Sequence, residues 1–151
     1  MNDDRLAALN ALLREALALH EQGVGTLARA VMTFLSERAK EPGAEPLAQV
    51  LAQATSEVRY QDDAGWNGVP QTQAQAVELF DQSRWALSQG LWWPAQIGFQ
   101  IMESLLSSDA EQLMISWLWV GRETAAAGMR SNSGEVVLLG VRAMQLSPAD
   151  S

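Results

Sequence analysis

The chain has 151 residues, 48% of them hydrophobic, which is enough for one domain with a core and too short to expect two. Its formal net charge of -8 opposes binding to nucleic acid, because no basic stripe is present to contact phosphates. The absence of cysteine excludes disulfides, thiol catalysis and thiolate metal sites, and it fits a cytoplasmic protein.

Helix signals dominate the first forty residues. Asp3 and Asp4 are placed to cap a helix and to favour its N-terminal dipole. Gly23 and Gly25 weaken or end this helix, and a second apolar pattern then runs from Thr26 to Ala39. The segment is therefore either one interrupted helix or a short hairpin. The first helix is indicated by apolar residues at three- and four-residue spacing: Leu6, Leu9, Leu13 and Leu17.

Two segments that break helices enclose the next one. Glu41 to Pro46 contains two prolines and a glycine, which cannot continue a helix. A third helix is predicted from about Leu47 to Tyr60. The loop Gln61 to Pro70 follows, and it is the best candidate for a subdomain boundary within a single helical domain spanning residues 1–151.

A long helical stretch is predicted from Gln71 towards Ser107, and its second half is strongly apolar. Gly90 and Pro94 lie within it. Proline lacks the backbone N–H and its ring collides with the preceding turn. Pro94 therefore either kinks one long central helix or separates two helices.

The segment Ser108 to Glu111 has the form of a capping box, so the next helix should start there and run to about Arg130. A last helix is predicted from Glu135 to Gln145, with Asn132 and Glu135 at the same cap spacing. No convincing strand is present. We predict an all-α fold, a bundle of about five to six helices with a long apolar central helix.

The titratable side chains offer little for catalysis. The chain has one histidine, His20, one lysine, Lys40, and one tyrosine, Tyr60. His20 could act as a base in hydrolase-like chemistry, but a histidine at a helix end more often caps carbonyls or faces solvent. The acidic pair Asp62–Asp63 lacks further ligands at a recognisable spacing. We therefore expect no enzyme, no metal and no cofactor.

The tryptophans are the most informative residues, because five of the six fall between Trp85 and Trp119. If residues 91–107 are helical, a narrow polar stripe runs along that helix and passes, when projected back, between Trp92 and Trp93. The stripe consists of Gln96, Gln100, Glu103 and Ser107. On the following helix, Trp119 lies on the polar side.

The tryptophans of this region, together with Phe99, define a candidate hydrophobic or partner-binding surface. An apolar face of this kind can instead be covered by the N-terminal helices or by another copy of the chain, which would make the protein a homo-oligomer. Tryptophan fits each case, since it combines a large apolar area with one N–H that prefers a wet edge. The candidate residues are Trp85, Trp92, Trp93, Phe99 and Trp119.

Several segments between Gln71 and Ser147 follow one another in an order that is typical of a known family of helical proteins. A long helix rich in Gln, Ala and aromatic residues is followed by Ser107-Ser-Asp-Ala-Glu-Gln-Leu113, by Arg122-Glu-Thr-Ala-Ala-Ala-Gly128 and by a final helix closing at Leu146-Ser-Pro148. In this half, the chain resembles phasins, the helical proteins that coat polyhydroxyalkanoate granules in bacteria. The resemblance implies a non-enzymatic coating protein that adsorbs to a polyester granule in the cytoplasm.

A second hypothesis fits the same surface. An adaptor, chaperone or regulatory protein would use the tryptophans as anchors for a protein partner or for self-association, in keeping with the enrichment of tryptophan among binding hot spots. We expect no membrane-spanning helix, because Gln96, Gln100 and Glu103 interrupt the most apolar segment.

Overall fold

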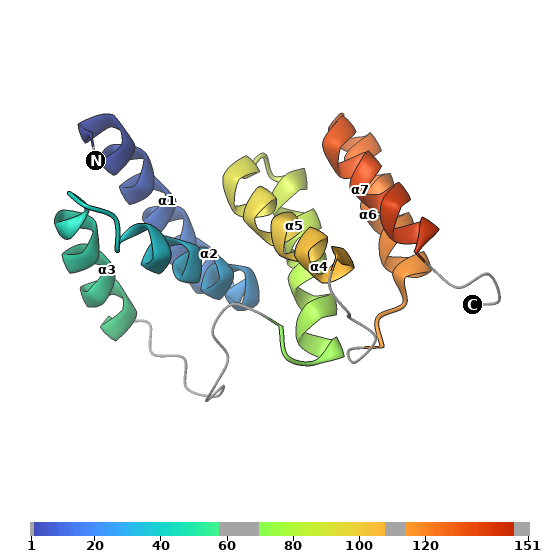
Figure 1. Cartoon of the computed structure of the whole chain (residues 1–151), viewed down its shortest axis with the longest axis horizontal. Coiled ribbons are helices and arrows are strands. Elements are labelled where there is room, and N and C mark those ends of the chain that lie inside the picture. Colours follow the sequence, from blue (N-terminus) through green and yellow to red (C-terminus); the bar gives the residue numbers. More distant parts are fainter. Residues whose placement is uncertain (1, 58–69, 108–113, 147–151) are drawn as a thin grey trace. The chain divides into compact units, whose positions relative to one another are not determined.

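The computed structural model describes residues 2–57, 70–107 and 114–146, and these ranges contain seven helices and no strand (Figure 1). The predicted all-α class is confirmed, with more helices than the five to six expected. The chain divides into two compact units, unit 1 (residues 1–69) and unit 2 (residues 70–151), and each is described by itself. Except for Pro70, the loop Gln61 to Pro70 lies outside the described residues.

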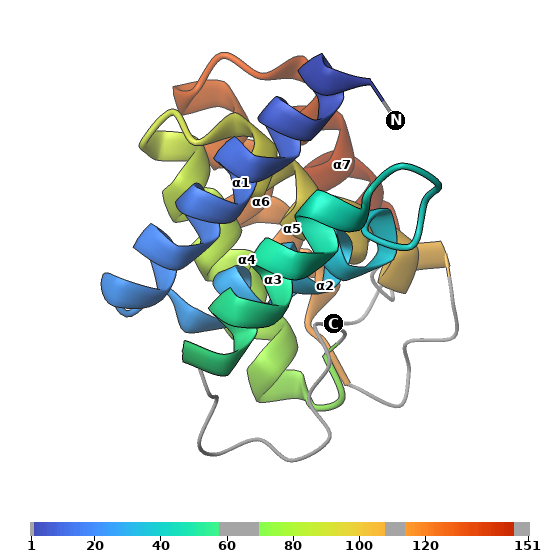
Figure 2. The ribbon, with the colours of Figure 1, turned by 90° about the vertical axis from the view of Figure 1, so that its left-hand side faces the viewer.

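Unit 1 contains three helices, α1 (Asp3–Glu21), α2 (Gly25–Arg38) and α3 (Glu45–Glu57) (Figure 2). The N-cap of α1 is Asn2, whose side-chain oxygen accepts a hydrogen bond from the Arg5 N–H at 2.8 Å. The expected caps Asp3 and Asp4 instead occupy the first helical turn, where they favour the helix dipole. The first forty residues thus form a hairpin of two helices.

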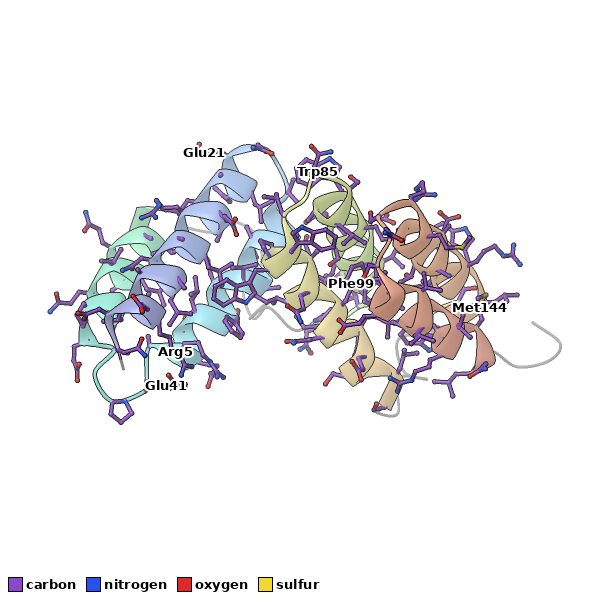
Figure 3. The ribbon with its side chains drawn as sticks, turned by 90° about the horizontal axis from the view of Figure 1, so that it is seen from above. Arg5, Glu21, Glu41, Trp85, Phe99 and Met144 are labelled. Carbon is purple, nitrogen blue, oxygen red and sulfur yellow. The ribbon has the colours of Figure 1, made fainter. Side chains whose placement is uncertain are left out.

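The three helices of unit 1 pack against one another around an apolar core. Arg5 of α1 pairs with Glu41, in the connection before α3, at 3.0 Å (Figure 3). Arg38 lies 3.6 Å from the same carboxylate, so Glu41 is shared between two guanidinium groups. The fully buried side chains include Leu12, Leu19, Leu27, Leu35 and Leu47.

Unit 2 contains four helices, α4 (Gln73–Ser88), α5 (Trp92–Ser107), α6 (Trp117–Arg130) and α7 (Gly134–Gln145). Helix α4 pairs with α5, and α6 pairs with α7. The two pairs are joined because α4 also contacts α6 and α5 also contacts α7. Unit 2 is therefore two helical hairpins that share a core.

The predicted long central helix is wrong, because the chain forms α4 and α5 as separate helices. The break lies at Gly90, whose φ of 77° is a left-handed conformation that glycine adopts without steric cost. Pro94 falls in the first turn of α5. There its missing N–H removes no intrahelical hydrogen bond, so the proline neither kinks nor ends a helix.

The start of α6 also differs from the prediction. The proposed capping box, Ser108 to Glu111, lies outside the described residues, and α6 begins only at Trp117. For α7, the N-cap is Ser133 rather than Asn132, since the Ser133 hydroxyl accepts from the Val136 N–H at 3.4 Å.

Helices α6 and α7 meet along a seam of small residues. A Cβ added at Gly140 would lie 2.4 Å from the Ala125 backbone nitrogen and 2.5 Å from the Gly121 carbonyl oxygen. A Cβ added at Gly128 would lie 2.6 Å from the Val137 nitrogen. The two backbones are therefore in direct contact, which only glycine permits at these positions.

Candidate hydrophobic groove and tryptophan surface

The candidate surface residues differ in their exposure. Trp85, near the end of α4, is 36% exposed, and Trp92, the first residue of α5, is 57% exposed. Trp119 on α6 is 45% exposed, and Trp93 is half-buried. Phe99, which is labelled on α5 in Figure 3, is only 6% exposed. Four of the candidates are thus accessible to solvent, and the fifth lies deeper.

A groove of about 260 Å³ lies between α5 and α7, and Leu87 of α4 also lines it. Every residue that lines it belongs to unit 2. Trp92, the first residue of α5, also lines the groove and is exposed. The apolar wall consists of Leu87, Ala95, Phe99, Val136 and Leu139.

The polar stripe expected on α5 forms one rim of this groove. Gln96, Gln100 and Glu103 all line it and are exposed, and Trp92 continues the same helical face towards the N-terminus. Arg142 of α7 donates a hydrogen bond to the Glu103 carboxylate at 3.1 Å. The stripe is therefore part of a concave site and not simply a face directed towards water.

Helix α7 supplies the opposite rim through Ser133 and Glu135. Glu135 is exposed in the first turn of α7, where a carboxylate is stabilised by the helix dipole. The sequence suggested only a capping role for Glu135. Its part in the groove could not be inferred because α5 and α7 are separated in sequence by the whole of α6.

Trp119 lies outside the groove, next to a buried cation. The guanidinium of Arg84, on α4, lies 5.8 Å from the centroid of the Trp119 ring and is paired with Asp81. The Arg84 side chain is only 10% exposed. Burial lowers the pKa of Arg84, whereas the nearby charges of Asp81 and Glu123 act in the opposite direction. Trp119 therefore covers part of a buried arginine, a neighbour that the sequence analysis missed.

The structure describes only part of the set of residues considered for catalysis. His20 lies near the end of α1 in unit 1, half-buried, while Tyr60 and the Asp62–Asp63 pair lie outside the described residues. Within the described ranges, no group of three metal-ligating side chains comes together. None of the helices in those ranges is long and apolar enough to cross a membrane.

Comparisons of the chain with protein-family models, curated proteins and solved structures found no match. Inferences about function therefore depend on the groove and on the exposed tryptophans of unit 2.

Proposed function

We propose that the chain is a non-enzymatic helical binding protein that attaches to hydrophobic material through unit 2. The observation that carries this proposal is the exposure of Trp92, a residue that is 57% exposed and lines an apolar groove. Tryptophan is enriched among the residues that contribute most to protein binding. Further exposed apolar side chains of unit 2 are Trp85, Met114, Trp119, Met129, Leu138 and Leu146.

The material that we propose first is a polyester granule in the cytoplasm, as in the phasins that the sequence resembles. Attachment would be adsorption, in which exposed apolar side chains leave water and the acidic remainder of the chain keeps particles apart by charge repulsion. Each tryptophan that becomes fully buried would contribute on the order of 2 to 3 kcal/mol, so a few would suffice.

The second candidate is an adaptor or regulatory protein that binds a protein partner or a second copy of the chain. A specific observation favours it: the apolar wall of the groove is concave and is bounded by carboxylates and amides. A flat polymer surface has no need of a concave site, whereas the side chains of a protein partner enter such sites.

Adsorption to polyester particles tests the proposal. The full chain should bind the particles, and Trp92→Ala should weaken adsorption about tenfold, since roughly 1.4 kcal/mol corresponds to one decade. Val50→Ala is the control, because Val50 is an exposed apolar residue on α3 of unit 1. A wild-type chain that stays in solution would overturn the coating hypothesis. Light scattering would measure self-association directly.

A further inference from the structure

We infer that the groove between α5 and α7 binds a peptide segment of a partner protein in which an apolar side chain is followed closely by arginine or lysine. This inference rests on the second candidate function proposed above, a protein that binds a partner through unit 2, and it specifies the chemistry of that partner. It is supported by three properties of the groove: its size, the charge on its rims and the position of Trp92.

The size of the groove fits protein side chains. Its volume of about 260 Å³ lies just below the roughly 300 to 1,000 Å³ of most small-molecule sites. Phe99 and Leu139 face it from two different helices, so an apolar side chain that enters is contacted from both sides. A groove of this kind between two helices accepts the apolar face of a peptide.

The acidic rims of the groove favour a positively charged partner segment. Glu103 lies on the α5 rim and Glu135 on the α7 rim, and neither arginine nor lysine lines the groove. Arg142 neutralises part of the charge of Glu103. Glu135 makes no ion pair within the described part of the chain, so its carboxylate is available to a partner. A guanidinium or ammonium group would pair with it, whereas an acidic segment or a phosphate would be repelled.

Trp92 adds a second contact for a cation. Trp92 lines the groove and is 57% exposed as a residue, so its indole can be reached by a guanidinium group that stacks on it. An arginine next to the inserted apolar side chain would therefore meet an aromatic ring and a carboxylate at the same site. Arginine is preferred over lysine here because its planar group both stacks and forms paired hydrogen bonds.

Fluorescence anisotropy of the full chain with labelled helical peptides tests this inference. One probe peptide contains Ala, Leu and Arg, and the matched peptide carries Glu at every Arg position. The Arg peptide should bind, and the Glu peptide should bind at least tenfold more weakly. Added salt should reduce binding of the Arg peptide.

Two charge reversals separate the groove from general electrostatic attraction. Glu135→Lys should weaken binding of the Arg peptide about tenfold, because it removes a favourable charge and adds a repulsive one. Glu78→Lys makes the same change at an exposed position on α4, outside the groove, and should have an effect of less than about twofold. Equal effects of the two substitutions, equal affinity for the two peptides, or no binding of the Arg peptide would each overturn the inference.

Polyester adsorption by the same variants separates this inference from the proposed function. Glu135→Lys retains Trp92 and should still adsorb to particles while it loses the Arg peptide. A wild-type chain that binds the Arg peptide but not the particles would overturn the coating hypothesis and support the groove. If Trp92→Ala still adsorbs to particles and still binds the Arg peptide as the wild type does, both the coating hypothesis and this inference are overturned.

Discussion

The guanidinium of Arg84 lies 5.8 Å from the centre of the Trp119 ring, and this contact joins α4 to α6. Trp119 is on the polar side of its helix, a position that in the sequence suggests a ring displaced from the core. The structure gives it a local partner. Part of the exposed aromatic surface of unit 2 therefore serves the packing of the unit itself.

A double-mutant cycle measures the Arg84–Trp119 contact. Arg84→Met and Trp119→Leu, made separately and together, should give a coupling free energy of about 0.5 to 1 kcal/mol, since the pair is partly exposed. The measurement is urea unfolding followed by circular dichroism. Additive effects of the two substitutions would show that the ring and the cation do not interact.

The seam between α6 and α7 predicts a large effect from one methyl group. Gly140→Ala would place its Cβ 2.4 Å from a backbone nitrogen that cannot move independently of its helix. The free energy of unfolding should fall by about 1 to 3 kcal/mol or more. Gly134→Ala, at the first residue of α7, is the control, because a Cβ there meets nothing within 4 Å. It should be neutral or stabilise by about 0.4 to 1 kcal/mol, so equal destabilisation by both would refute the close approach.

Glu15 predicts a component of the pH dependence of stability. Burial raises the pKa of Glu15 in the folded protein above its ordinary value. The folded state therefore binds this proton more tightly than the unfolded state, and the stability contributed by the protonated form is lost as the pH rises from below about 4.3 towards neutrality.

Glu15→Gln should remove this component. The variant should lose less stability than the wild type over the same rise in pH, as measured by the urea midpoint at several pH values. Because Glu15 is half-buried, the expected difference is small. Arg14→Gln, which alters the adjacent exposed residue, is the comparison. Parallel pH profiles for the wild type and Glu15→Gln would contradict the prediction.

Unit 2 should fold without unit 1. Residues 70–151 contain four helices that contact one another and bury their own core, which includes Phe80, Met102 and Val120. We expect a fragment of these residues to be helical by circular dichroism and to unfold in one cooperative transition. A fragment with little helix, or with no sharp transition, would show that its core depends on unit 1.

Helix boundaries could be predicted where a local signal controls them. The end of α7 at Gln145 follows from such signals, whereas the glycines after α1 left open one interrupted helix or a hairpin, and the structure has the hairpin. A break near residues 90 to 94 is visible in the sequence, but its cause is not, because proline is compatible with a first helical turn as well as with a break. The rule that predicts a kink assumes that the residue lies deep inside a helix.

The groove could be predicted only in part. The stripe from Gln96 to Glu103 and the unusual place of Trp92 are visible in the spacing of α5. Val136 and Leu139 cannot be recognised as groove residues from the sequence, since any core-facing helix has apolar residues of this kind. Their position beside Phe99 depends on how α7 packs against the other helices. That packing depends on glycines, and a pattern of apolar residues does not show which glycines permit close approach.

The seam of glycines determines how substitutions acquired during evolution can alter the groove. Gly140 follows Leu139 directly, so the residue that allows α7 to approach α6 is adjacent to one that lines the groove. A larger residue in the seam would push α7 outward and carry Leu139 with it. The width of the groove could thus be altered by mutations at positions that do not line it.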